Sequence, residues 1–531
     1  MKSFTHTFFS VLALACMTNA DFPGIDREDM IEEMEHFLVD NTGTNSVPIV
    51  AAVSPCSNYA GFASDPTNRG EQTSAQWVRF AFHDFVTGNV AAGTGGLDAS
   101  LGFESDRPEN HGLFVNDTLE FLAPTQSAYL SMADQIALGV LVSVAQCGGN
   151  AKAIPLRVGR IDASAAGPSG VPTPFTAIEP TLAQFAQAGM SQSDTIGLVY
   201  DLSFFLSPNA DFASACGHSL GRVHAVNFPD IVGDSPITST NLDGGVSFDS
   251  TPAALDPTGM NEYLTGTGKA GGPLVTSSNV SARSDFRLFN SDSNATITTL
   301  AANTGQICSG LFEKMLNTVP STVSLSDPIT AMPWKVVDFN MHISSGGSVR
   351  IEGLIRALWT DTAPPNQISY TLVSSSGNGS THLSDAASGT GSGLFGSTTY
   401  YHFVIATDSP GTTGMTFEGF TYNFSDEIFI LPSQSTVKSG ANTIEIKAAV
   451  LTSTLNGGTM TGTLYVPETQ EGTLAKKINI VTVPMTVLST NGDYTLFDGL
   501  ASVSGVSSVI AKVAVGDTGS KTVKTTLFAQ D

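Results

Sequence analysis

The order of apolar and polar positions divides the chain into a helix-rich part and a strand-rich part. Apolar residues recur at helical spacing over residues 25–41, with acidic residues on the opposite side, so an amphipathic helix is predicted there. A second helix is predicted after residues 73–74, whose hydroxyl groups can cap it. That helix carries Arg79 and His83, one helical turn apart on the same face.

The same periodicity predicts further helices along the first 320 residues, at residues 130–146, 181–188, 193–206, 212–224 and 298–316. From about residue 335 the pattern changes to short runs of Val, Ile, Thr, Tyr and Phe separated by Gly, Ser and Asn. These runs predict β-strands at residues 348–360, 400–407, 443–452 and 478–488. We therefore expect one or two β-sandwich units of about a hundred residues each.

The boundary between the two parts is predicted within residues 317–335, where Pro320, Pro328 and Pro333 interrupt a polar stretch. The sequence leaves open whether this stretch is a linker or a tail that wraps the first domain. The expected organisation is a signal peptide at 1–20, a mainly helical domain at 21–334 and an all-β region at 335–531.

Composition adds limits on the partners. The chain has 531 residues, 41% of them apolar, and a formal charge of −25 from 48 acidic and 23 basic side chains. Such a surface repels phosphate backbones and anionic lipids, so neither nucleic acid nor a membrane is an expected partner.

Residues 1–20 combine a lysine, an apolar run and a small-residue end, which is typical of a secretory signal; the alternative is an N-terminal core helix. We expect a secreted, extracellular protein. Four cysteines follow, Cys56, Cys147, Cys216 and Cys308, and predict two disulfides with three connectivities open. Acceptor motifs for N-glycans stand at Asn116, Asn279, Asn294, Asn378 and Asn423.

Two stretches carry candidate chemistry. In the first, oxygen donors of the kind calcium prefers follow His83; they are Asp84, Gly96, Asp98 and Ser100. The alternative is a polar turn rich in Gly and Asp.

In the second stretch, small residues surround His218 on a predicted helix and would allow a flat group to approach. A similar donor set follows it, Ser219, Asp249, Thr251 and Asp256, which could instead be a turn cluster. Either histidine alone could be an ordinary core or surface residue.

Taken in order, the motifs resemble those of the secreted fungal, class II-like haem peroxidases of the plant, fungal and bacterial peroxidase superfamily. The resemblance covers about residues 30–330. Its motifs are R-x-x-F-H-D at 79–84, G-x-D-x-S at 96–100, P-E-N-x-G-L at 108–113, G-R-x-D-A at 159–163, H-S at 218–219, F-D-S-T-P at 248–252 and R-S-D at 283–285. The resemblance implies two helical subdomains that sandwich a non-covalent haem b.

The resemblance also implies roles. His218 would be the iron ligand, and Asp285 would accept the other ring N–H of that histidine. On the opposite side His83 would exchange a proton with hydrogen peroxide, and Arg79 would stabilise the charge that develops as the O–O bond breaks. Two neighbours complete this side: Asn110 would orient His83, and Phe82 would pack over the haem.

Two calcium ions are implied as well. The first would bind Asp84, Gly96, Asp98 and Ser100, and the second Ser219, Asp249, Thr251, Asp256 and a carbonyl near Ala254. The resemblance suggests a Cys56–Cys147 bridge; Cys216–Cys308 is inferred to join the helix of His218 to the last helix.

One departure concerns manganese. Some family members bind this ion with three acids, and those places hold Gln72, Gln76 and His224 here. We therefore do not expect direct oxidation of manganese.

The leading hypothesis is a secreted, monomeric haem peroxidase that reduces hydrogen peroxide and oxidises small phenolic or dye-like donors by one-electron steps. The alternative is an extracellular matrix or cell-wall protein that keeps a peroxidase scaffold and binds polysaccharide through the β-rich region.

Overall fold

The computed structural model describes residues 23–60, 68–198, 216, 218–233, 235–344, 346–374, 377–407 and 410–531. The proposed signal peptide at 1–20 lies outside these residues. So does most of the segment 199–217, which held the ends of two predicted helices.

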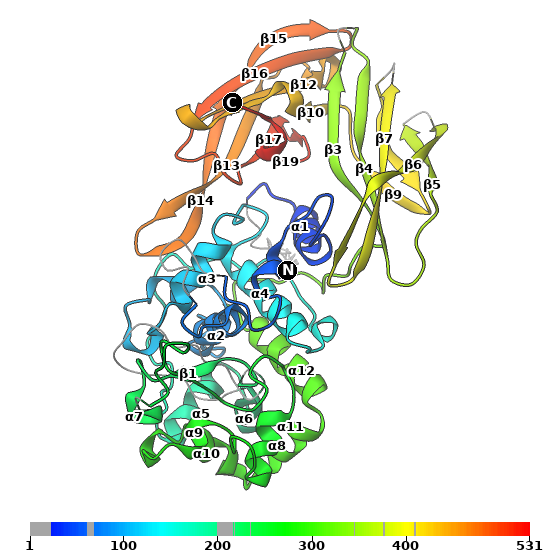
Figure 1. Ribbon diagram of the computed structural model, residues 1–531. Helices are drawn as coiled ribbons and strands as arrows, with labels where there is room; N and C mark the ends of the chain where they lie inside the picture. Colours follow the sequence, from blue (N-terminus) through cyan, green and yellow to red (C-terminus); the bar gives the residue numbers. More distant parts are fainter. Residues whose placement is uncertain are drawn as a thin grey trace, which may run out of the picture.

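The described residues between 23 and 316 form a mainly helical body (Figure 1). The longer helices are α1 (Arg27–Val39), α2 (Thr73–Val86), α3 (Phe114–Leu122), α4 (Met132–Gln146), α5 (Ile178–Gln187), α6 (Gln192–Leu198), α8 (Thr258–Thr265), α10 (Ser284–Phe289), α11 (Ala295–Ala302) and α12 (Thr304–Leu316). Short helices α7 (Pro229–Val232) and α9 (Pro273–Thr276) and a hairpin of β1 (Arg222–His224) and β2 (Gly245–Ser247) complete this body.

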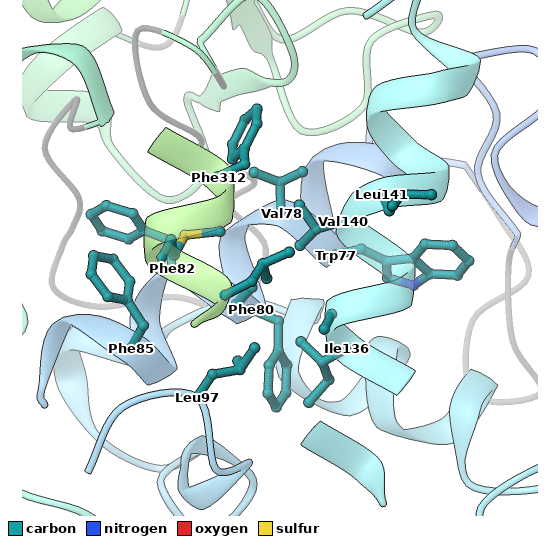
Figure 2. Packing of buried hydrophobic residues seen from close by; sticks show 14 of the residues in the cluster. Trp77, Val78, Phe80, Phe82, Phe85, Leu97, Ile136, Val140, Leu141 and Phe312 are labelled. Carbon is teal, nitrogen blue, oxygen red and sulfur yellow. The ribbon is translucent and has the colours of Figure 1, made fainter. Parts of the chain in front are cut away.

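Helix α2 runs through the middle of the body, and all its residues are buried. Figure 2 shows its apolar side chains between α4 and α12, with Trp77 beside α4 and Phe312 contributed by α12. Gly139 of α4 allows this close packing, because a β-carbon there would come within 3.2 Å of the Trp77 ring. The catalytic candidates on α2 therefore stand on a rigid element.

Three predictions about helices need correction. The predicted helix 298–316 is two helices, α11 and α12, separated at Asn303. The expected cap of α2 is also wrong, because Thr73 is already helical and Gln72 at the N-cap position makes no capping side-chain hydrogen bond. The end of the predicted helix 212–224 is strand β1, because Gly221 has φ +84° and the chain then pairs with β2.

Residues 317–333 are a tail that wraps the helical body, which resolves the alternative left open by the sequence. The backbone N–H of Ser326 donates to the carbonyl of Val158 at 2.9 Å, and that of Ile329 to Leu156 at 2.8 Å. Arg27 of α1 donates to the carbonyl of Ser324 at 2.8 Å.

Strands begin at Trp334, and the described residues of the first β unit form one seven-stranded antiparallel sheet in the order β3-β4-β7-β6-β5-β8-β9. Strand β6 pairs with β7 through its second half and with β5 through its first half. The sheet therefore folds over, and both halves fill one apolar core. The bounds are β3 (Trp334–Ile343), β4 (Val349–Trp359), β5 (Gln367–Ser374), β6 (Gly377–Gly393), β7 (Gly396–Thr407), β8 (Thr412–Phe417) and β9 (Phe420–Asn423).

Residues 428–531, all described, form a second β unit with its own core between two sheets. One sheet has the path β15-β16-β12-β11-β20 with β10 beside β12, and the other β14-β13-β17-β18 with β19 beside β17. The strands are β10 (Ile428–Ile430), β11 (Thr436–Lys438), β12 (Thr443–Leu451), β13 (Met460–Gln470), β14 (Thr473–Pro484), β15 (Thr486–Asn491), β16 (Tyr494–Ser502), β17 (Ile510–Val515), β18 (Thr518–Gly519), β19 (Val523–Lys524) and β20 (Ala529–Gln530). The predicted strand 478–488 is divided between β14 and β15, because β14 ends at Pro484 and Met485 separates it from β15.

Both β units pack on the helical body around α1, which lies between them and the other helices (Figure 1). Arg356 of β4 is fully buried and contacts Glu35 of α1 at 2.5 Å and Asp40 at 3.2 Å. Tyr400 of β7 donates to Asp40 at 2.8 Å. In the described part of the chain, no helix is both long and apolar enough to cross a membrane.

Candidate active site

The Arg79 and His83 side chains lie together on the buried face of α2. Arg79 is 1% exposed and His83 is fully buried. The Nε–H of Arg79 donates to Nε2 of His83 at 3.2 Å, and an Nη2–H of Arg79 donates to the carbonyl of His111 at 3.0 Å. The helical spacing thus creates a direct contact between the two groups.

Asn110 fixes the other side of the histidine ring. Its Oδ1 lies 2.8 Å from Nδ1 of His83, so the ring proton belongs on Nδ1 and the lone pair on Nε2. Burial and the neighbouring charge of Arg79 hold the pKa of His83 well below 6.5, although the Asn110 hydrogen bond opposes this shift. His83 is therefore neutral at pH 7 and has the protonation state of a general base.

Glu104 is a residue that the sequence reasoning missed. The Asn110 side chain donates to the Glu104 carbonyl at 3.1 Å and to its Oε2 at 3.4 Å. Glu104 also accepts from the backbone N–H of Gly167 and pairs with Arg107 at 2.8 Å. No spacing in the sequence singled out Glu104, and its role is to hold Asn110.

Phe114 was also missed by the sequence reasoning, and it packs against both Arg79 and His83. Its ring centroid lies 3.7 Å from Cζ of Arg79 and 5.0 Å from the ring of His83. Phe82, predicted to pack over a haem, contacts the rings of Phe85 and Phe185 at 5.5 and 5.7 Å.

The first predicted cation loop folds back onto the end of α2. Both oxygens of Asp84 accept hydrogen bonds from the loop; the donors are the backbone N–H groups of Asp98, Ala99 and Leu101 and the hydroxyl of Ser100. Burial and the charge of Asp98 raise the pKa of Asp84 well above 3.8. Gly96 has φ +102°, and a β-carbon there would come within 2.4 Å of the Thr318 carbonyl.

His218 lies in a turn before β1 rather than on the predicted helix. Leu220 forms a bridge with Ala253, which draws the turn toward the second cation loop. The His218 ring is 5% exposed and stacks on Phe248, with ring centroids 3.7 Å apart and planes 7° apart. Burial lowers the pKa of His218 well below 6.5.

Asp285 begins α10 and is fully buried. Its Oδ1 accepts from the Ser284 hydroxyl at 3.0 Å, and among the described residues its Oδ2 has no hydrogen-bond partner. The structure does not join Asp285 to His218 by the predicted hydrogen bond. Burial raises the pKa of Asp285 well above 3.8.

The second predicted cation loop brings three of its donors together. The Thr251 hydroxyl donates to Asp256 at 3.2 Å, and the Thr251 backbone N–H donates to Asp249 at 2.8 Å. The Ala254 backbone N–H donates a hydrogen bond to the Thr251 carbonyl at 3.0 Å, so Ala254 closes the turn. Ser219 and Asp256 both line a cavity of about 20 Å³ next to His218.

Each of these loops offers two carboxylates. No group of three or more His, Cys, Asp or Glu side chains in the described residues is arranged to hold a metal ion. Either loop would therefore have to complete its ligand set with hydroxyl and backbone oxygens, as calcium sites commonly do.

The three places compared with a manganese site hold side chains with other contacts. Gln72 donates to the Cys56 carbonyl at 2.7 Å, and Gln76 donates to Asp117 at 2.8 Å. His224 is fully buried, and within the described part of the chain neither ring nitrogen has a hydrogen-bond partner. Burial, followed by the charges of Arg222 and Arg79, lowers the pKa of His224 to about 3.

The cysteines form the bridges Cys56–Cys147 and Cys216–Cys308, so the predicted number and pairing of disulfides are confirmed. The first bridge joins the segment before α2 to the end of α4. The second joins the turn of His218 to α12.

Comparison with known proteins gives the family. A family model described as Peroxidase matches residues 61–303. A WSC domain-containing protein of Arthroderma benhamiae is 34% identical over 510 residues, which are 91% of this chain and 64% of that protein. The Arabidopsis thaliana protein named "Putative L-ascorbate peroxidase 6" is 32% identical over 127 residues, 23% of this chain and 37% of that protein.

Manganese peroxidase 3 of Phlebia radiata is 31% identical over 135 residues, which are 23% of this chain and 36% of that enzyme. The chain thus covers less than two thirds of the length of each of these relatives. The Peroxidase model covers residues 61–303, the helical region that carries the Arg79, His83 and Asn110 cluster. This region of the chain belongs to the plant, fungal and bacterial peroxidase superfamily.

Proposed function

We propose that the chain is a haem-dependent peroxidase that reduces hydrogen peroxide. The observation that carries this proposal is the buried Arg79–His83–Asn110 chain, in which a neutral imidazole has its proton on Nδ1 and its acceptor atom beside a guanidinium. A base and a fixed positive charge in one buried site suit the transfer of a proton and the stabilisation of a leaving oxygen anion.

The residues present fit a haem. Both ring nitrogens of His224 and Oδ2 of Asp285 are buried without hydrogen-bond partners among the described residues. Leaving a buried polar group unsatisfied costs about 1–3 kcal/mol, so the His224 ring favours a partner that is not part of the protein. His218 would hold the iron, and the unpartnered Oδ2 of Asp285 would accept the second ring N–H of this ligand.

When bound, the haem would supply the electrons that cleave the peroxide bond. His83 would take a proton from hydrogen peroxide at Nε2 and return it to the departing oxygen. The peroxide would first displace the Nε–H of Arg79 from this nitrogen, which frees the guanidinium to face the same oxygen. Asn110 keeps the Nδ1–H in place, so the imidazole accepts and releases the proton at one atom only.

Calcium fits both loops chemically. In the first loop, burial and the charge of Asp98 raise the pKa of Asp84. In the second loop, burial and then the charge of Asp256 raise the pKa of Asp249 to about 6. Oδ2 of Asp249 is buried and unpartnered within the described residues. A hard divalent cation would relieve the repulsion and supply the missing partner.

The finer parts of the proposal rest on the resemblance to secreted fungal peroxidases. We propose small phenolic or dye-like molecules as electron donors and the extracellular space as the location. Two disulfides support a location in an oxidising compartment. A monomer is proposed as the working state.

The test is to reconstitute the full chain with haem and to follow its Soret band after adding hydrogen peroxide by stopped-flow spectroscopy. A rapid shift that reverses when a phenol is added, with one equivalent of peroxide oxidising two equivalents of phenol, is expected. A chain that binds haem but shows no shift at millimolar peroxide would contradict the proposal.

A further inference from the structure

A cavity of about 830 Å³ lies where the helical body and the two β units meet. Its walls come from α1, from strands β3 and β9 of the first β unit and from residues around β17 and β19 of the second. Exposed residues such as Asp26 and Ser425 line it, so it reaches the surface. Its volume lies within the range of about 300–1,000 Å³ that is usual for sites of organic ligands.

One wall of the cavity is aromatic. Phe339 of β3 lies 5.4 Å from the ring of Tyr422 of β9 and 4.9 Å from that of Phe424. Phe339 and Tyr422 are only partly buried, so their rings remain available at the cavity wall. Lys521 holds its Nζ 4.5 Å from the centre of the Tyr422 ring.

The facing wall is the polar side of α1, the face that an amphipathic helix normally turns to solvent. Burial raises the pKa of Asp29 and of Glu32. The charges around the cavity are mixed; the acids are Asp26, Asp29, Glu32, Glu33 and Asp338, and the lysines are Lys335, Lys521 and Lys524.

This mixture excludes ligands of high charge. Lys524 pairs with Glu33 at 2.5 Å and Lys335 with Glu35 at 3.1 Å, so part of the charge is neutralised within the protein. A polyanion would meet the remaining carboxylates, and a polycation would meet the lysines. A hydroxyl group both donates and accepts hydrogen bonds, so a neutral ligand rich in hydroxyls matches both kinds of group.

We propose that this cavity binds a segment of a neutral carbohydrate chain, with sugar rings against Phe339 and Tyr422 and sugar hydroxyls bonded to the carboxylates of α1 and to Lys521. Aromatic rings suit this task because they offer a large, flat apolar face at low cost in side-chain entropy. The inference does not depend on the proposed peroxidase activity, since the cavity is separate from Arg79 and His83.

The test is calorimetric titration of the full chain with laminarihexaose, cellohexaose, chitohexaose and mannohexaose. We expect at least one to bind with a Kd below about 1 mM. Tyr422→Ala should weaken that binding by about tenfold, whereas Phe420→Ala should not, because Phe420 lies on the same strand, is 38% exposed and does not line the cavity.

A second pair of variants controls for the chance that Tyr422→Ala does not fold. Lys521 is exposed, so Lys521→Ala should fold normally and still weaken binding, and Lys438→Ala, exposed and outside the cavity, should not. The proposal is overturned if none of the four sugars binds, if neither Tyr422→Ala nor Lys521→Ala weakens the binding, or if spermine or hexaglutamate binds more tightly than every sugar. The haem spectrum of each variant reports separately on the peroxidase site.

Discussion

The Nε–H of Arg79 points at Nε2 of His83 across 3.2 Å, one turn along α2. This contact occupies the lone pair that a general base needs, and after burial the positive charge of Arg79 is the second cause that lowers the pKa of the ring. The pair is thus arranged so that an incoming peroxide replaces one hydrogen bond with another inside a buried site.

Replacing His83 by Leu should remove the base while leaving the helix intact, because the position lies inside α2 and Leu is a good helix former. The rate of the peroxide step should fall by about a hundredfold to ten-thousandfold. Stopped-flow measurement of the Soret shift in the haem-loaded chain is the check. His402→Leu, the same change at an exposed histidine of β7, should leave the rate unchanged; equal rates for wild type and His83→Leu would remove His83 from this role.

Glu104→Gln should disturb the site through Asn110. The substitution weakens the ion pair with Arg107 and the hold on the Asn110 amide, so His83 loses part of its orientation. We expect the peroxide step to slow by about tenfold, as is typical when the partner of a catalytic ligand is altered. Because the Asn110 bond raises the pKa of His83, the acid limb of the rate profile should also move to lower pH; a loss of stability with an unchanged profile would mean that Glu104 is only structural.

Arg356→Ala should destabilise the contact between α1 and the first β unit. It leaves the buried Asp40 carboxylate without its counter-ion and leaves Glu35 with Lys335 alone, which costs about 3–5 kcal/mol of unfolding free energy. Urea unfolding followed by tryptophan fluorescence measures this loss. Arg350→Ala on the same strand breaks an ion pair in which Arg350 is 56% exposed, and it should cost less than about 1 kcal/mol. Similar losses for the two variants would show that the buried cluster adds nothing special.

Acid should weaken the same contact. Burial alone would raise the pKa of Glu35, but Lys335 and Arg356 attract its charged form and hold the pKa below 4.5. A lowered carboxyl pKa stabilises the fold above pH 4.5, and this contribution is lost as the pH falls below that value. The thermal midpoint should therefore fall faster below pH 4.5 in the wild type than in Glu35→Gln. Parallel curves would contradict the assignment.

Removal of calcium should lower thermal stability. A ligand that binds only the folded chain stabilises it, so dialysis against EGTA should reduce the midpoint and added calcium should restore it. Asp84→Asn and Asp249→Asn should each reduce this response. Asp361→Asn, at an exposed acid of the first β unit, should retain it fully. A thermal midpoint that changes with neither EGTA nor added calcium would contradict calcium binding by both loops.

Local patterns predicted part of the site around Arg79 and His83. The spacing of Arg79 and His83 on one helix dictates that they meet, since four residues make about one helical turn. Asn110 and Glu104 come from the segment between α2 and α3, and only the resemblance to a family suggested Asn110. Nothing in the spacing reveals Glu104, because its bonds to Asn110, Arg107 and Gly167 depend on how three loops pack.

The segment around His218 was harder to predict from the sequence. Periodicity predicts a helix at residues 212–224, yet residues 218–224 form a turn and a strand because they pair with residues 245–253. Pairing between segments some thirty residues apart overrides local propensity, and periodicity does not report it.

The sequence by itself determined the helical and β-rich parts, the number of disulfides and the acidic polar face of α1, because these follow from periodicity, residue type and charge. Only the tertiary structure decided that residues 317–333 wrap the helical body and that the polar face of α1 is covered by two β units. Arg356 could then meet Glu35 across 321 positions of sequence, and a cavity could form beside them. Such contacts depend on how separate surfaces fit together, which a pattern within one segment does not encode.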